Sequence, residues 1–215
     1  MNQTTKRLTA CAMLAAAAYV VMAIGRIPVV LFLSYDPKDI IIAIGGFLYG
    51  PLSAMGISVV VSLLEMVTVS STGFIGCIMN ILSTCSFVCV ASYLYRKKNT
   101  PMGAFMGLLV GCLVMTGVML LWNYLITPLY MGYPREAVAA LLLPAFLPFN
   151  LVKGGLNAAL VLLLYKPVVT ALRRARLAEP SAAGAGGRAR GGIALLALAA
   201  LATFLLLALA LRGVI

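Results

Sequence analysis

The chain has 215 residues, of which 63% are hydrophobic and 10% are charged, and its formal net charge is +11. Soluble domains carry about 25% charged residues, so this composition predicts an integral membrane protein. The chain contains no histidine, the residue that most often serves in acid–base catalysis and metal binding. We therefore expect no catalytic residue, no metal site and no cofactor.

Six apolar runs are candidate membrane-spanning helices, because about 20 apolar residues cross a bilayer. They are Leu8–Ile24, Ile40–Tyr49, Leu52–Val69, Phe74–Tyr95, Met102–Ile126 and Phe149–Tyr165. The second run is short and crosses only if Asp39 lies near the interface. The last begins inside a longer stretch, which Pro144 and Pro148 divide because proline interrupts helices. Residues 137–143 are then a short interfacial piece.

The remaining C-terminal sequence differs in composition from the six runs. Residues 177–192 are rich in Ala, Gly and Arg, as linkers are. Residues 193–215 form a plain apolar run that is long enough for a further crossing, and we expect an anchor or packing helix there. The fold class is all-α: a six-helix transmembrane bundle at 1–176, followed by the linker and a C-terminal transmembrane helix.

Basic residues gather on one side of this topology. Lys6 and Arg7 precede the first span, residues 96–98 follow the fourth, and Lys166 and several arginines follow the sixth. With the N-terminus in the cytoplasm, all of these positions are cytoplasmic, as the positive-inside rule requires. We expect a multi-pass protein of the cell membrane that binds no nucleic acid. The loops at 26–38 and 129–135 then face outside.

The sixth span carries a polar stripe. Asn150, Lys153 and Asn157 are spaced i, i+3, i+7 and share one helical face. A charged side chain near the bilayer centre costs at least about 2.5 kcal/mol, so it faces a cavity, a partner or a ligand. In a purely structural alternative, Lys153 pairs with Glu65, the one acidic residue within another apolar run.

Two further spans carry amides at a comparable depth. Asn123 lies in the fifth span and Asn80 in the fourth, where each could either join helices by hydrogen bonds or contact a ligand. Aromatic residues such as Tyr130 lie nearby. Amides beside flat apolar walls predict an outward-opening pocket for a planar, mostly neutral molecule. A cation pathway would need more than one buried carboxylate, and the sequence suggests only Glu65.

The first span has a surface of small side chains. Ala12 and Ala16 form a small-xxx-small pair, which lets two membrane helices approach closely. The contact is either internal to the bundle or made with another subunit.

Several segments together resemble the substrate-binding S components of energy-coupling-factor (ECF) vitamin importers, in particular their riboflavin-binding, RibU-like group. The resemblance covers about residues 6–172 and lies in Tyr35-Asp36-Pro37-Lys38-Asp39, Gly45-Gly46-Phe47-Leu48-Tyr49-Gly50-Pro51, Ser70-Ser71-Thr72-Gly73-Phe74-Ile75-Gly76 with Met79-Asn80, Trp122-Asn123-Tyr124 with Pro128 and Tyr130, and Pro148-Phe149-Asn150-Leu151-Val152-Lys153.

The resemblance implies a subunit that binds riboflavin from outside and performs no chemistry. Asn123, Asn150 and Lys153 would hydrogen-bond the vitamin, and the loop after the first span would act as a lid. Ala12 and Ala16 would dock on a membrane coupling subunit, which works with two ATPase subunits. Candidate ligand contacts are completed by Asn157, Asn80 and Tyr130.

Two alternatives stay open. The ligand could be another vitamin, such as thiamine or pantothenate, because amides and one lysine do not specify a ligand. The chain could also be a self-contained carrier or channel that uses Glu65 and Lys153 as a titrating pair.

Overall fold

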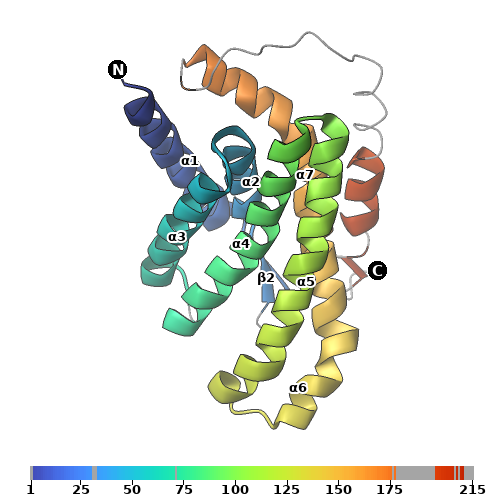
Figure 1. Ribbon diagram of the computed structural model, residues 1–215. Coiled ribbons are helices and arrows are strands. Elements are labelled where there is room, and N and C mark those ends of the chain that lie inside the picture. The colour runs from blue at the N-terminus through green and yellow to red at the C-terminus, as the bar shows by residue number, and fades with distance from the viewer. Residues whose placement is uncertain are drawn as a thin grey trace.

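The computed structural model describes residues 2–30, 33–70, 72–175, 177, 197–205, 207 and 209–210, with the backbone alone at 30, 130 and 131. These residues form a helical bundle with one small antiparallel hairpin (Figure 1). In chain order the elements are α1 (Gln3–Gly25), β1 (Ile27–Val30), β2 (Leu33–Tyr35), α2 (Lys38–Tyr49), α3 (Pro51–Thr68), α4 (Gly73–Lys98), α5 (Pro101–Met131), α6 (Arg135–Leu141), the π-helical turn η1 (Leu142–Phe146) and α7 (Leu147–Arg174).

Local sequence explains where several helices begin and end. Pro51 and Pro101 open α3 and α5, at positions where a helix has no use for the missing backbone N–H. Gly50 separates α2 from α3 with φ +94°, a conformation that glycine adopts without steric cost. A side chain at Gly50 would also collide with Arg96 at the end of α4.

The apolar surface and helix lengths fit a membrane protein. Among the described residues, five helical stretches are long and apolar enough to cross a membrane: α1, α3, α4, the α5 stretch up to Leu129, and Arg135–Arg174. Exposed apolar side chains such as Leu52, Val67 and Leu113 lie on the outside of these helices, where lipid tails would cover them. The helix α2 has 12 residues and does not belong to this set.

The region between α6 and α7 is less divided than predicted. Pro144 lies in η1, and Pro148 lies in the first turn of α7. The hydrogen-bonding pattern becomes π-helical where Pro144 occurs, but residues 135–174 remain one continuous helical stretch.

The loop at 26–38 folds back against the helices of the bundle. It forms the β1–β2 hairpin, with Ile27 opposite Tyr35, and its last residues turn back into the bundle. Asp36, Lys38 and Asp39 are all buried, and Asp39 has no exposed surface. The helix α2 is short because it begins inside the bundle, at the buried Lys38, directly after the hairpin.

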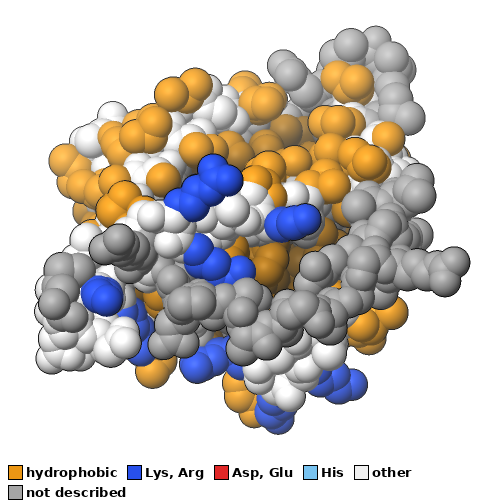
Figure 2. Space-filling model, turned by 90° about the horizontal axis from the view of Figure 1, so that it is seen from above, with side chains coloured by type: hydrophobic (Ala, Val, Ile, Leu, Met, Phe, Trp, Pro, Cys, Tyr) orange, Lys and Arg blue, Asp and Glu red, His pale blue; other side chains and the backbone are white. Residues whose placement is uncertain are grey.

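Many of the exposed basic residues lie at one end of the bundle (Figure 2). The guanidinium of Arg7 on α1 donates to the Tyr49 carbonyl at 2.9 Å, and Tyr49 Oη donates to the Leu177 carbonyl at 3.0 Å. The start of α1, the α2–α3 turn and the chain after α7 therefore meet at this end. Figure 2 views it from above: Lys and Arg side chains are visible, and no carboxylate is visible among the coloured atoms.

The C-terminal segment is helical where it is described. Residues 197–205 form a helix on the side of the bundle away from α1, next to α5 and α7 (Figure 1). Ala197 is buried. The ring of Phe204 lies so close to Gly155 of α7 that a Cβ there would be 2.2 Å from it. Residues 178–192 of the predicted linker lie outside the described residues.

Candidate ligand-binding site

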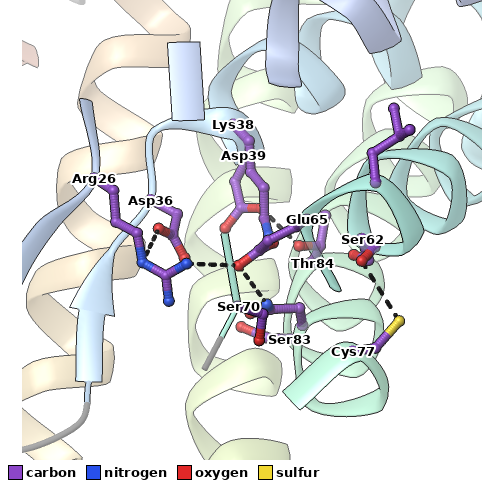
Figure 3. Close-up of polar contacts among 12 residues, drawn as sticks. Arg26, Asp36, Lys38, Asp39, Ser62, Glu65, Ser70, Cys77, Ser83 and Thr84 are labelled. Carbon is purple, nitrogen blue, oxygen red and sulfur yellow. Dashed lines mark hydrogen bonds and ion pairs between the residues drawn. The ribbon is translucent and has the colours of Figure 1, made fainter. Parts of the chain in front are cut away.

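Six buried or half-buried charged side chains form two connected groups in the half of the bundle that contains the hairpin. Figure 3 shows five of them: Arg26, Asp36, Lys38, Asp39 and Glu65. The three cations are Arg26, Lys38 and Lys153, and the three carboxylates are Asp36, Asp39 and Glu65. Because the numbers of positive and negative charges are equal, the cluster can be electrically neutral while every member is ionised.

Glu65 is the centre of the first group. It forms a buried ion pair with Lys38, and its Oε1 lies 3.1 Å from Nη1 of Arg26. Asn80 Nδ2 donates to the same oxygen at 2.9 Å. The alternative in which Glu65 pairs with Lys153 is therefore wrong, because two other cations occupy the carboxylate.

Asp39 is the centre of the second group. Its Oδ1 accepts a hydrogen bond of 2.7 Å from Thr84, and its Oδ2 accepts one of 3.2 Å from Asn157. The ammonium of Lys153 lies 3.7 Å from the same Oδ2. Lys153 thus has a carboxylate partner, but this partner is Asp39 and not Glu65.

Asp36 completes the set from the hairpin side. Its Oδ1 lies 3.5 Å from Nε of Arg26, an ion-pair distance without hydrogen-bond geometry. Burial raises the pKa of Asp36, and the nearby Lys38 and Lys153 cations oppose that rise. The expectation of one buried carboxylate was therefore wrong by two, because the acidic residues of the hairpin loop fold into the bundle.

A cavity of about 40 Å³ lies beside these groups. It is lined by Arg26, Leu33, Ser34, Asp36, Thr72, Met79, Asn80, Ser83, Met119, Asn123, Phe149, Asn150 and Lys153. Four of the six predicted ligand contacts, namely Asn80, Asn123, Asn150 and Lys153, are thus brought together from α4, α5 and α7.

Lys153 retains hydrogen-bonding capacity in this cavity. Its side chain is 6% exposed. It donates to Ser83 Oγ at the long distance of 3.4 Å, and its ion pair with Asp39 is longer still. An ammonium has three N–H donors, and among the described residues only Ser83 lies within hydrogen-bond distance. The remaining donors are available to a molecule in the cavity.

The two cavity amides of α5 and α7 are held by their own helices. Asn123 donates to the Met119 carbonyl at 2.7 Å, and Asn150 donates to the Phe146 carbonyl at 2.8 Å. Each bond uses one of the two hydrogens of the amide nitrogen. The amides are therefore oriented in advance, and each has a second N–H left to donate.

Asn157 and Tyr130 occupy different positions from the other candidates. Asn157 has no exposed surface and does not line the cavity. Its Oδ1 accepts from Tyr35 Oη at 2.9 Å while its amide donates to Asp39, so it links the hairpin to α2. The side chain of Tyr130 lies outside the described residues.

Five polar residues of the cavity wall were not among the predicted contacts: Arg26, Ser34, Asp36, Thr72 and Ser83. Arg26, Ser34 and Asp36 belong to the loop at 26–38, which was expected to face outside. A sequence signal did exist for two of the buried carboxylates, because Glu65 lies within an apolar run and Asp39 lies next to one, where an ionised group requires a partner.

Ala12 and Ala16 lie on the exposed face of α1, whereas Ala15 and Ala18 on the same helix are buried. The small-xxx-small pair therefore points away from the bundle.

Within the described part of the chain, no group of three His, Cys, Asp or Glu residues could hold a metal ion, and the five cysteines are free.

Comparisons with known proteins agree with this architecture. A family described as the substrate-specific component of ECF transporters matches residues 6–165. The riboflavin transporter RibU of Staphylococcus aureus (strain TCH60) is 29% identical over 181 residues, which cover 80% of this chain and 95% of that protein. The riboflavin transporter FmnP of Bacillus subtilis (strain 168) is 27% identical over 188 residues, covering 80% of this chain and 98% of that protein.

A solved structure shows the same fold. The S component of a bacterial ECF transporter superposes with a TM-score of 0.68 at 28% sequence identity, covering 80% of this chain and 99% of that one. The matched family region contains every element from α1 to most of α7. The chain belongs to the family of substrate-specific components of ECF transporters.

Proposed function

We propose that this protein binds riboflavin from outside the cell and delivers it for ATP-driven import as the substrate-specific subunit of an ECF transporter. The names of its relatives supply the ligand. One observation supports the cavity as the binding site. Lys153 is a buried ammonium with spare hydrogen-bond donors, and it lines the cavity together with amides from three helices.

The chemistry of riboflavin suits this lining. Its isoalloxazine ring is planar and carries carbonyl oxygens and ring nitrogens that accept hydrogen bonds, which Lys153, Asn123 and Asn150 can donate. Phe149, Met79 and Met119 supply apolar wall. Ligand sites of this kind combine flat apolar surface with a few oriented polar groups. We assign Asn80 to the same shell, and place Asn157 and Tyr130 at its edge.

The size of the cavity requires a movement on binding. Sites for molecules of this size have volumes of about 300–1,000 Å³, whereas the cavity here measures about 40 Å³. The hairpin contributes Leu33 and Ser34 to the wall, and it is held by fewer packed elements than the helices. The hairpin is therefore the lid, and it moves outward when the vitamin enters.

Orientation and partners follow from the charged end and from α1. The basic residues at the end shown in Figure 2 support an N-terminus in the cytoplasm, by the positive-inside rule. Together with the five long apolar helices, α2 and the hairpin form a sixth crossing. The C-terminal helix adds a seventh. The exposed Ala12–Ala16 face docks on the coupling subunit. The chain has no Walker A sequence, so the two ATPase subunits supply the energy.

A titration of the purified protein with riboflavin tests the proposal. We expect saturable quenching of flavin fluorescence at micromolar concentration or below, with thiamine and pantothenate unable to compete. Absence of quenching at micromolar flavin would overturn the assignment, and competition by thiamine or pantothenate would transfer the site to another vitamin.

A matched pair of variants tests the site. Lys153→Met removes the cavity ammonium, whereas Lys166→Met makes the same change at an exposed position of the same helix. We expect the first to weaken riboflavin binding about 30-fold, since hydrogen bonds to charged groups contribute about 1.5–3 kcal/mol, and the second to change it less than twofold.

Uptake by liposomes that contain this chain alone would instead favour a self-contained carrier.

A further inference from the structure

We propose that Asp39 is the positioning residue of the binding site: it holds the Lys153 ammonium at the cavity wall and connects that ammonium to the hairpin. The inference rests on the proposed function, because it concerns how the ligand-binding lysine is oriented. Asp39 itself does not line the cavity, so it acts through Lys153.

The contacts of Asp39 use both of its oxygens. Thr84 of α4 donates to Oδ1 at 2.7 Å. Asn157 donates to Oδ2 at 3.2 Å, and Lys153 places its ammonium 3.7 Å from that same atom. Asp39 stands in the first turn of α2 and has no exposed surface. It therefore joins α2, α4 and α7 at one point.

Asn157 extends this connection to the hairpin. Tyr35, the last residue of β2, donates its hydroxyl hydrogen to Asn157 Oδ1 at 2.9 Å. Asp39 Oδ2 is thus shared by the cavity lysine and by the amide that fastens the hairpin. Displacement of Tyr35 when a ligand enters would release Asn157 and change how Asp39 is shared between its two donors.

A carboxylate is required at this point by the number of donors around it. Three donor groups converge on Asp39, and an ionised carboxylate offers acceptor sites only. An asparagine would replace one oxygen with an NH₂ group, which would face at least one of these donors. It would also remove the negative charge nearest to Lys153 and so release the ammonium from its place beside Ser83.

A double-mutant cycle between Asp39→Asn and Lys153→Met tests the proposal, with riboflavin affinity as the measurement. We expect Asp39→Asn alone to weaken binding at least tenfold. The double variant should bind no more than twofold worse than Lys153→Met alone, because a residue that only positions Lys153 has no function once the lysine is gone. Multiplicative losses in the double variant would overturn the proposal.

Thr84→Val is the matched control, since it removes a hydrogen bond from the oxygen of Asp39 that does not face Lys153. We expect less than a threefold change in affinity, and a loss equal to that of Asp39→Asn would show that Asp39 has only a general structural role. If Asp39→Asn fails to fold, the double variant should fold again, because it contains no unpaired lysine; failure of this rescue would also overturn the proposal.

The wild-type titration separates this inference from the proposed function. Wild-type protein that does not bind riboflavin would overturn the proposed function, whatever the variants do. Wild-type protein that binds riboflavin, combined with independent effects in the cycle, would overturn only the role of Asp39.

Discussion

The two halves of the bundle are built on different physical principles. In the half near the basic end, Phe47, Tyr95 and Tyr165 form an aromatic cluster with ring centroids 4.5 to 6.2 Å apart. There α4 and α5 approach so closely that a Cβ at Gly111 would lie 2.5 Å from the Phe87 carbonyl oxygen. The half near the hairpin contains the ion pairs, the amides and the cavity.

The apolar half is expected to be rigid, and the polar half is expected to rearrange. Close apolar packing has no vacant space and tolerates little change in volume. A cluster of ion pairs and amides can exchange partners, provided that every buried charge keeps one. We expect the apolar half to act as the support that holds α4, α5 and α7 in place, and the polar half to rearrange when the ligand enters.

Removal of the central carboxylate should disrupt the polar half most strongly. Glu65→Gln leaves Lys38 and Arg26 without their shared partner, and loss of one member of a buried ion pair costs about 3–5 kcal/mol. Thermal unfolding in detergent measures the loss. Glu136→Gln, at an exposed position of α6, is the matched control and should leave the unfolding temperature unchanged. Equal unfolding temperatures for both variants would contradict the central role of Glu65.

A methyl group between α4 and α5 should disrupt the apolar half. Gly111→Ala places a Cβ against the Phe87 carbonyl, and such overpacking costs about 1–3 kcal/mol. Gly117→Ala, on the same helix, meets no atom within 4 Å and should stabilise the helix by about 0.5–1 kcal/mol. The two variants should therefore shift the unfolding temperature in opposite directions. A rise for both would show that the helices are less tightly packed than described.

Truncation of one amide should affect ligand binding and leave the support intact. Asn123→Ala removes one oriented donor and should weaken riboflavin binding about three- to tenfold, since one hydrogen bond contributes about 0.5–1.5 kcal/mol. The unfolding temperature should change little. Thr116→Val, on the same helix but outside the cavity wall, serves as the control. An unchanged affinity for the Asn123 variant would place the ligand elsewhere.

The smallest effect on the isolated protein is expected on the outer face of α1. The double variant Ala12→Leu, Ala16→Leu adds bulk to an exposed surface, so riboflavin affinity and stability should not change. Co-purification with the coupling and ATPase subunits should be lost, because bulky side chains prevent close helix approach. Ala17→Leu, exposed on another side of α1, should preserve the complex. Retention of the complex by the double variant would exclude this face as the docking surface.

Sequence reasoning succeeded for the features that depend on local periodicity. The face shared by Asn150, Lys153 and Asn157 follows from the repeat of one helix, and so does its burial in α7. The change to a π-helical pattern at Pro144 follows from the chemistry of a single residue. The burial of Asp36, Lys38 and Asp39 was not predicted, because nothing in a short stretch with charged and aromatic residues distinguishes an exposed loop from one that packs against the bundle.

The sequence by itself determined that this is a helical membrane protein with a basic end, and that amides and one lysine are buried along particular helical faces. Only the tertiary structure decided that Lys153 pairs with Asp39 and that Lys38 and Arg26 share Glu65. The reason is physical: helical periodicity spans a few residues, whereas the bond between Asn157 and Asp39 joins positions 118 apart. Which of several buried carboxylates meets which cation depends on how the whole bundle packs.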